Sequence, residues 1–349
     1  MAELRVRRNR LKLRAPLRMA WGELHVREIL EVRLTFGPDD YGNGEAAPLE
    51  AYDGVSMAAV RAALDVYAEV VRRVPTTASH AEILAGCARE RWLPQALAAI
   101  DLALWDRAGR KAGKPVAALL SAGWKKTVPV NATISGVDPI YAAAEAYRAA
   151  SAGYRTVKVK VGLRGDAARV AAVRTAVGPD VAIRVDANGA WRNPQDALQN
   201  LRELVPAGIE LAEEPVHGIE QLREVREHSP IPIGMDETAA EPGALEADAA
   251  DVVCLKVSRC GGISGVLQQA QVARAAGAQV FVASSFDGPL GVAAGIHAAA
   301  VLETSGPLPA CGLATLGMFE ELAHVMPIDN GQVDVPAVPG ILGMPPAPR

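Results

Sequence analysis

Residues 127–322 repeat one pattern, in which a short apolar run and a polar turn precede a longer alanine-rich stretch. Short apolar runs rich in β-branched residues predict buried strands, and alanine-rich stretches such as GDAARVAAVRTAV predict helices. We expect eight strands, in the sequences VPVNATI, TVKVKV, VAIRVDA, IELAEE, IPIGMDE, VVCLKV, QVFVASS and LPACGLA. Strands that alternate with helices indicate parallel βα units. About eight such units predict an α/β fold, a TIM-like barrel of the (β/α)7β type over residues 127–322.

The first 120 residues have a different pattern and predict a separate α+β domain, 1–120. Alternation predicts strands at 4–14 and 28–36, separated by the intervening segment. The stretch SMAAVRAALDVYAEVVRRV has apolar residues three and four apart, as an amphipathic helix does, and a second helix is expected to begin near Pro94. The tail at about 325–349 is rich in glycine and proline, and we expect it to pack back on this first domain or to be loose.

Composition and charge exclude several classes of protein. The 349 residues are 50% apolar with a net charge of −4, which allows a large core and gives no basic stripe for nucleic acid. The one basic stretch, at 4–14, alternates at the period of a strand and is interpreted as a solvated strand face. No apolar run suits a membrane span or a signal peptide. Four scattered cysteines without a CxxC pair suit reduced thiols in a cytoplasmic enzyme rather than a zinc site.

The stretch TVKVKVG at 156–162 places two lysines in a strand that otherwise looks buried. Residues two apart in a strand point to the same side, so Lys158 and Lys160 face one side together. Such a pair is usually an exposed strand face. Here the residues that end the following strands change the interpretation.

Charged residues stand at the C-terminal ends of the next predicted strands, one per strand. They are Asp186, Glu213, Asp236 and Lys256, they follow Lys160, and successive members are 20–27 residues apart. In a TIM-like barrel the active site forms at these strand ends. A single acidic residue there is usually a helix N-cap, but an ordered series on consecutive strands indicates a site.

Three carboxylates in one cavity cannot all stay ionised unless a cation offsets their charge. Oxygen ligands suit a hard divalent ion, so we expect Asp186, Glu213 and Asp236 to bind Mg²⁺, with Mn²⁺ able to substitute. The metal would hold a substrate carboxylate and stabilise the enediolate that forms when a lysine removes the α-proton. A second ammonium close by would lower the pKa of that lysine and let it act as a base near neutral pH.

Two of the expected ligands have acidic neighbours in the sequence. Adjacent strand residues face opposite ways, so only one residue of each pair can reach the metal directly. We favour Glu213 over Glu214 and Asp236 over Glu237. We expect Glu237 to hydrogen-bond near Lys256.

The motifs KVKV, RVDANGAW, EEPV, MDET and LKVSRCGG, together with GNGEAAPLEAY near the start, resemble the muconate lactonizing enzyme subgroup of the mandelate racemase-like enolase superfamily. The resemblance covers nearly the whole chain and implies that the first domain, completed by the tail, caps the barrel. It implies that Lys160 is the acid/base on one face and that Lys158 tunes it. Lys256 would be a second base in a racemase or epimerase, or a cation over the enediolate in a dehydratase. The residues expected to contact the substrate are Trp21, Thr133, Ser284 and Ser285.

Within that subgroup, VNATISG, ASSFDGPLGVAAGIHAAA and ACGLATLGMFEE are most similar to the o-succinylbenzoate synthases of menaquinone synthesis. The implied reaction is a lyase reaction, the β-elimination of water from a small carboxylate substrate. The alternatives are the isomerases N-succinylamino acid racemase and dipeptide epimerase, and then a muconate cycloisomerase-like lyase. Dipeptide epimerases of this kind carry a DxD pattern after the seventh strand, where this chain has only Asp287. The resemblance also implies a homo-oligomer.

Two other classes fit the sequence less well. A Schiff-base aldolase would use one desolvated lysine and no metal, and it would leave the three carboxylates unexplained. A binding protein on this scaffold would be expected to have lost at least one lysine or ligand, and all are present.

Overall fold

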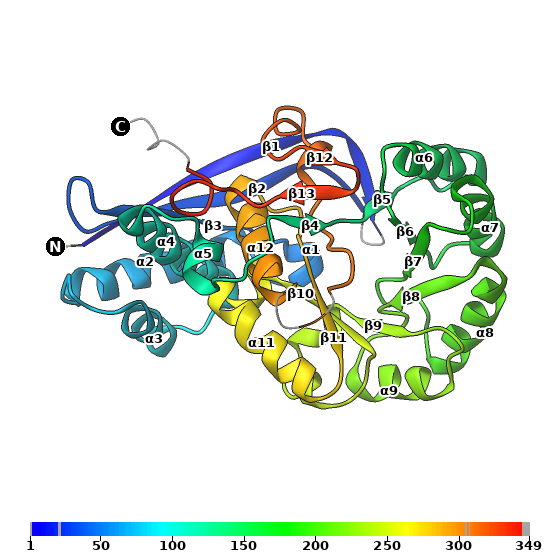
Figure 1. Cartoon of the computed structure of the whole chain (residues 1–349). Helices are drawn as coiled ribbons and strands as arrows, with labels where there is room; N and C mark the ends of the chain where they lie inside the picture. The colour runs from blue at the N-terminus through cyan, green and yellow to red at the C-terminus, as the bar shows by residue number, and fades with distance from the viewer. Residues whose placement is uncertain (1, 20–21, 304–305, 307, 344–349) are drawn as a thin grey trace.

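The chain folds into a barrel with a smaller capping domain beside it, as the sequence predicts (Figure 1). The computed structural model describes residues 2–19, 22–303, 306 and 308–343. Among these residues, no helix has both the length and the apolar character that crossing a membrane would require.

Seven parallel strands form the barrel in the order β11-β10-β9-β8-β7-β6-β5. Their bounds are Ala132–Ile134 (β5), Thr156–Lys160 (β6), Ala182–Asp186 (β7), Ile209–Glu213 (β8), Ile233–Met235 (β9), Val252–Lys256 (β10) and Gln279–Ala283 (β11). The expected eighth strand is reduced to two residues, Cys311 and Gly312, which form parallel bridges to Val130 and Ala283. These bridges join the two edges of the sheet and close the barrel.

Helices cover the outside of the barrel. They are α6 (Pro139–Ser151), α7 (Asp166–Val177), α8 (Pro194–Leu204), α9 (Ile219–His228), α10 (Val257–Cys260), α11 (Ile263–Ala275) and α12 (Pro289–Leu302). Local sequence sets several of the starts, because proline occupies the first helical position of α6, α8 and α12. Short 3₁₀ turns, η2 (Glu237–Ala240) and η3 (Ala244–Glu246), replace a helix between β9 and β10.

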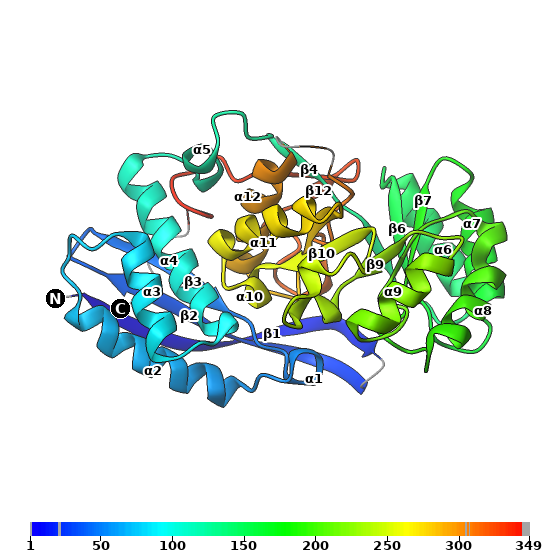
Figure 2. The same ribbon diagram turned by 90° about the horizontal axis from the view of Figure 1, so that it is seen from below.

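The capping domain is a three-stranded antiparallel sheet with helices on one face (Figures 1 and 2). The strands are β1 (Glu3–Met19), β2 (Gly22–Thr35) and β3 (Tyr41–Ala46). The helices are α1 (Glu50–Asp53), α2 (Met57–Arg73), α3 (His80–Glu90), α4 (Pro94–Ala112) and α5 (Val116–Leu120). Apolar residues of β2, β3 and α2–α4 make a core of their own.

The two N-terminal strands are longer than the sequence predicts. Of the segment 15–27, expected to separate them, residues 15–19 belong to β1 and residues 22–27 to β2, because the hairpin resumes after a register shift with Leu17 opposite Leu24. The basic stretch is a solvated strand face, as interpreted. Arg7 and Arg8 on β1 pair across the hairpin with glutamates of β2, and pairing of this kind cannot be seen in one strand alone.

Strand β3 packs directly on the backbone of α4. A Cβ on Gly44 would lie 2.0 Å from the carbonyl oxygen of Ala99, so only glycine allows this approach. Replacing Gly44 with alanine should lower the free energy of unfolding by about 3 kcal/mol. The matched control is Gly37→Ala, whose Cβ would meet only the side chain of Asp40 at 3.9 Å. Urea denaturation followed by circular dichroism compares the two, and equal stabilities would contradict the close approach.

The C-terminal tail packs back on the first domain and on the barrel. Strand β12 (Ile328–Asp329) pairs with β13 (Gln332–Asp334), which pairs with β4 (Thr127–Pro129) at the entry to the barrel. The N–H of Ile341 donates to Asp106 in α4 at 2.9 Å. The carbonyl of Ile341 accepts from Nε2 of His297 in α12 at 2.7 Å, so the tail ties the cap to the barrel.

Candidate active site

Five neighbouring strands bring a charged side chain to the same end of the barrel. Lys160, Asp186 and Glu213 end β6, β7 and β8, and they are direct partners in the strand register. Asp236 follows β9 at once, and Lys256 ends β10. The three carboxylates are almost fully buried, with exposed fractions of 1% for Asp186 and Glu213 and 3% for Asp236. The fold therefore brings the predicted series together.

Lys158 and Lys160 both point into this cluster, as their spacing on β6 predicts. Lys158 Nζ lies 2.8 Å from Asp186 Oδ2 and 3.0 Å from Glu213 Oε1. Lys160 Nζ lies 2.7 Å from the same oxygen of Asp186. Two ammonium groups can share one side of a strand here because carboxylates of the neighbouring strands offset their charge.

Burial and charge act against each other on these groups. Burial raises the pKa of Asp186, but Lys158 and Lys160 outweigh it and hold that pKa below its usual range. Burial raises the pKa of Glu213 to about 7, and the Asp186 and Asp236 carboxylates add to the effect against the opposing charge of Lys158. Burial lowers the pKa of Lys158, but Asp186 and Glu213 raise it above its usual range. Lys158 is therefore a fixed positive charge between two acids.

Lys256 flanks the carboxylates from the side opposite β6. Its ammonium pairs with Asp236, and Nζ lies 2.6 Å from the phenol oxygen of Tyr52 in the capping domain. The Tyr52 hydroxyl donates to Asp236 Oδ1 at 2.8 Å. Arg259 in α10 donates to the same phenol oxygen at 2.9 Å. A residue of the cap thus contacts the barrel site directly.

The expectation that Glu237 hydrogen-bonds near Lys256 is wrong. Glu237 Oε1 accepts from Nδ2 of Asn188 at 2.9 Å, and Asn188 Oδ1 accepts from Lys160 Nζ at 2.6 Å. Glu237 opens the 3₁₀ turn η2 instead of continuing β9, and its side chain is directed to Asn188. Glu237 therefore belongs to the surroundings of Lys160.

Glu214 faces away from the cluster, as expected for the neighbour of Glu213. Its backbone has a positive φ of 41°, which turns the carboxylate toward the loop after β9. There it accepts from the N–H of Asp236 at 2.7 Å and of Thr238 at 3.0 Å, and it pairs with His217. Glu214 holds the loop that carries Asp236.

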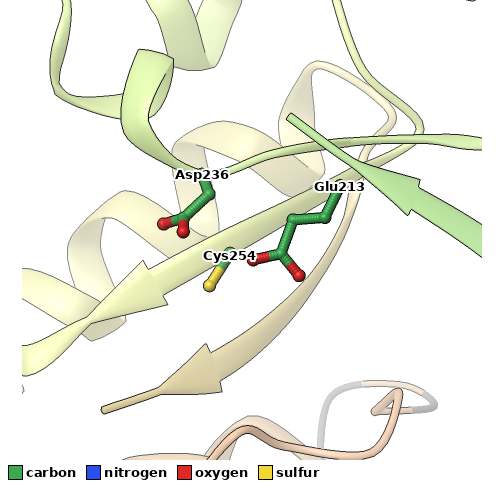
Figure 3. Close-up of side chains that lie close together, drawn as sticks. All are labelled: Glu213, Asp236 and Cys254. Carbon is green, nitrogen blue, oxygen red and sulfur yellow. The ribbon is translucent and has the colours of Figure 1, made fainter. Parts of the chain in front are cut away.

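Two of the three carboxylates expected to bind the metal, Glu213 and Asp236, lie in one close group of possible ligand atoms, whose third member is Cys254 and not Asp186. One oxygen each of Glu213 and Asp236 and the sulfur of Cys254 lie within 4.8 Å of one another (Figure 3). Burial holds the pKa of Cys254 well above its usual value, so the thiol stays protonated and is a poor ligand. Lys158 pairs with both Asp186 and Glu213. Its ammonium therefore supplies one positive charge to offset these two carboxylates. The oxygens of Asp186, Glu213 and Asp236 suit Mg²⁺ or Mn²⁺.

Comparisons with known families agree with this geometry. The enolase C-terminal domain-like family matches residues 141–345, and the mandelate racemase / muconate lactonizing enzyme N-terminal domain matches residues 1–121. The chain belongs to the mandelate racemase and muconate lactonizing enzyme family. It is therefore an enzyme of the enolase superfamily, which agrees with the resemblance of its motifs.

Relatives within the family catalyse different reactions. The L-Ala-D/L-Glu epimerase of Bacillus subtilis is 32% identical over 302 residues, 82% of this chain and 81% of the epimerase. The o-succinylbenzoate synthase of Thermobifida fusca is 42% identical over 211 residues, 56% of this chain and 63% of the synthase. A dipeptide epimerase of Enterococcus faecalis, solved with Mg and L-Leu-L-Tyr, has a TM-score of 0.87 at 26% identity and covers 97% of this chain and 98% of its own.

The residues expected to contact the substrate differ in how exposed they are and in their hydrogen bonds. Thr133 on β5 is exposed and lies beside Lys158 in the register, so both face the inside of the barrel. Ser284 and Ser285 are buried after β11. The Ser284 hydroxyl accepts from the N–H of Asp287 at 2.8 Å, whereas Ser285 Oγ has no partner among the described residues. Trp21 lies outside the described residues.

Three polar residues around the two lysines were missed in the sequence: Asn188 contacts Lys160, Tyr52 contacts Lys256, and Arg259 contacts Tyr52. Asn188 stands two residues after Asp186 in a strand-end loop, and Arg259 stands three residues after Lys256, so both positions offered a local signal. Tyr52 offered none, because it is 204 residues from Lys256 in the chain. Together with Glu237, these residues line a cavity of about 320 Å³ beside the cluster.

Proposed function

We propose that this family member removes the α-proton of a small carboxylate substrate and then eliminates water, as an o-succinylbenzoate synthase does. The observation that carries the chemistry is the pair of lysines, on β6 and β10, on either side of three buried carboxylates. The choice of reaction is supported by the 42% identity to the synthase of Thermobifida fusca.

Each residue of the cluster has a part in this proposal. Lys160 removes the α-proton and returns a proton to the departing hydroxyl, so the substrate loses one molecule of water and becomes aromatic. Lys158 stays charged between Asp186 and Glu213. Lys256 places positive charge over the other face of the enediolate. Mg²⁺ held by the three carboxylates would supply charge that stabilises the enediolate.

The second candidate is an isomerase that acts on N-succinylamino acids or dipeptides. It is favoured by Lys256, because a second lysine on the opposite side can return the proton to the other face. The similarity to the Bacillus subtilis epimerase over 81% of its length supports it as well. The absence of a full DxD pattern after β11 counts against a dipeptide epimerase, although Asp287 is buried with Oδ1 lacking a partner among the described residues while Oδ2 accepts from the N–H of Ser285. A muconate cycloisomerase-like lyase comes third.

The experiment compares two reactions in the presence of Mg²⁺. The purified enzyme is incubated with 2-succinyl-6-hydroxy-2,4-cyclohexadiene-1-carboxylate, and the aromatic product is followed by absorbance. In parallel, deuterium uptake from D₂O is measured in N-succinylamino acids and dipeptides. We expect fast aromatisation with slower exchange. Fast exchange without aromatisation would move the assignment to a racemase or epimerase, and silence in both would overturn the proposal.

A further inference from the structure

Each flanking lysine has one uncharged hydrogen-bond acceptor besides its carboxylate. Lys160 Nζ lies 2.6 Å from Asn188 Oδ1, and Lys256 Nζ lies 2.6 Å from the phenol oxygen of Tyr52. Neither acceptor is one of the carboxylates expected to bind the metal. The two acceptors come from different domains, since Asn188 follows β7 and Tyr52 belongs to α1 of the cap.

The amide of Asn188 is fixed in one orientation. Its Nδ2 donates to Glu237 Oε1 at 2.9 Å, so only Oδ1 is left to face Lys160. Its backbone N–H donates to Asp186 Oδ1 at 3.0 Å, and its φ of 45° lies in the left-handed region. Asparagine tolerates that conformation better than most residues. The loop and Glu237 together hold a neutral acceptor against the ammonium.

The phenol of Tyr52 is fixed in the same way at the other lysine. Its hydroxyl donates to Asp236, so its oxygen lone pairs are left for Lys256 and Arg259. The Lys256 ammonium also lies 4.8 Å from the centre of the ring.

We propose that Asn188 and Tyr52 are positioning residues, each for one lysine and so for one face of the substrate. A metal bound by Asp186 and Asp236 would draw on the oxygens that now hold the two ammonium groups. The neutral oxygens of Asn188 and Tyr52 then each accept a hydrogen bond from one N–H of their lysine. The rest of each amine group stays free to face the substrate. Because Tyr52 belongs to the cap, the position of Lys256 on its side of the substrate depends on contact between cap and barrel. The position of Lys160 on the other side depends on barrel residues. The proposal rests on the enediolate chemistry proposed above.

The test uses Asn188→Gly, which suits the left-handed backbone, and Tyr52→Phe, which removes only the phenol oxygen. Exchange of the α-hydrogen with D₂O is measured separately for the L and D isomers of an N-succinylamino acid. The variants Lys160→Ala and Lys256→Ala show which isomer, L or D, loses its α-hydrogen to each lysine. Each positioning variant should slow exchange at its own lysine about 100-fold and leave KM nearly unchanged. The other face serves as the internal control, and equal loss on both faces, or no loss, would overturn the proposal.

A second measurement does not depend on turnover. The chain has eight lysines, so side-chain NMR of lysine-labelled, Mg²⁺-loaded protein gives few signals, and the same alanine variants assign those of Lys160 and Lys256. Asn188→Gly should move the Lys160 signal alone, and Tyr52→Phe the Lys256 signal alone. If the wild-type enzyme exchanges neither isomer and forms no aromatic product, the proposed function fails. The NMR pattern then decides the positioning roles independently, and unchanged or jointly shifted signals would overturn them.

Discussion

Replacing Lys160 by alanine should slow removal of the α-proton by about 100- to 10,000-fold, the range that general acid–base catalysis contributes. Lys160 Nζ contacts Asp186 and Asn188, whereas Lys158 on the same strand is held between Asp186 and Glu213. Lys158 is therefore too tightly engaged to take its place. Aromatisation of the succinyl cyclohexadiene substrate and deuterium uptake measure the loss.

The fold should survive this substitution. Lys158 still pairs with Asp186 at 2.8 Å, so Lys160→Ala leaves no buried carboxylate without a partner. The matched control is Lys114→Ala, which changes an exposed lysine between α4 and α5. Both variants should melt within a few degrees of the wild-type protein. Wild-type turnover by Lys160→Ala would remove Lys160 from the role of base.

Exchanging Asp186 for asparagine should weaken Mg²⁺ binding at least about 100-fold and remove activity at ordinary metal concentrations. The substitution keeps the shape of the side chain but removes one of the charges that attract a divalent ion. Isothermal titration with Mg²⁺ measures the affinity. Asp180→Asn, an exposed residue before β7, is the matched control and should bind the ion as the wild-type protein does.

Metal removal gives a second measurement of the same prediction. The enzyme treated with EDTA should lose activity and recover it when Mg²⁺ or Mn²⁺ is added, because the charge on the enediolate is otherwise not offset. Full activity in the presence of a chelator would exclude the metal from the mechanism. Unchanged Mg²⁺ affinity in Asp186→Asn, with activity still metal-dependent, would instead move the ion to other ligands.

The sequence by itself determined the order of the barrel and the series of charged residues. Short apolar runs ending in Lys160, Asp186, Glu213 and Lys256 became strands that end at these residues. This was predictable because a parallel strand that is buried on both faces has a continuous run of apolar residues. In addition, residues two apart in a strand point to the same side of the sheet. Since all parallel strands end at one rim, the ends of the runs were enough to bring the charges together.

Only the tertiary structure decided what surrounds that series. Tyr52 reaches Lys256 from a helix of the cap, and Glu237 pairs with Asn188 rather than with Lys256. The lengths of β1 and β2 likewise depended on their pairing across the hairpin. Periodicity reports whether a position faces the core or solvent, but it carries no information on which distant residue lies opposite. Those partners are fixed by the packing of the cap on the barrel and by the paths of the loops, where no repeat constrains the side chains.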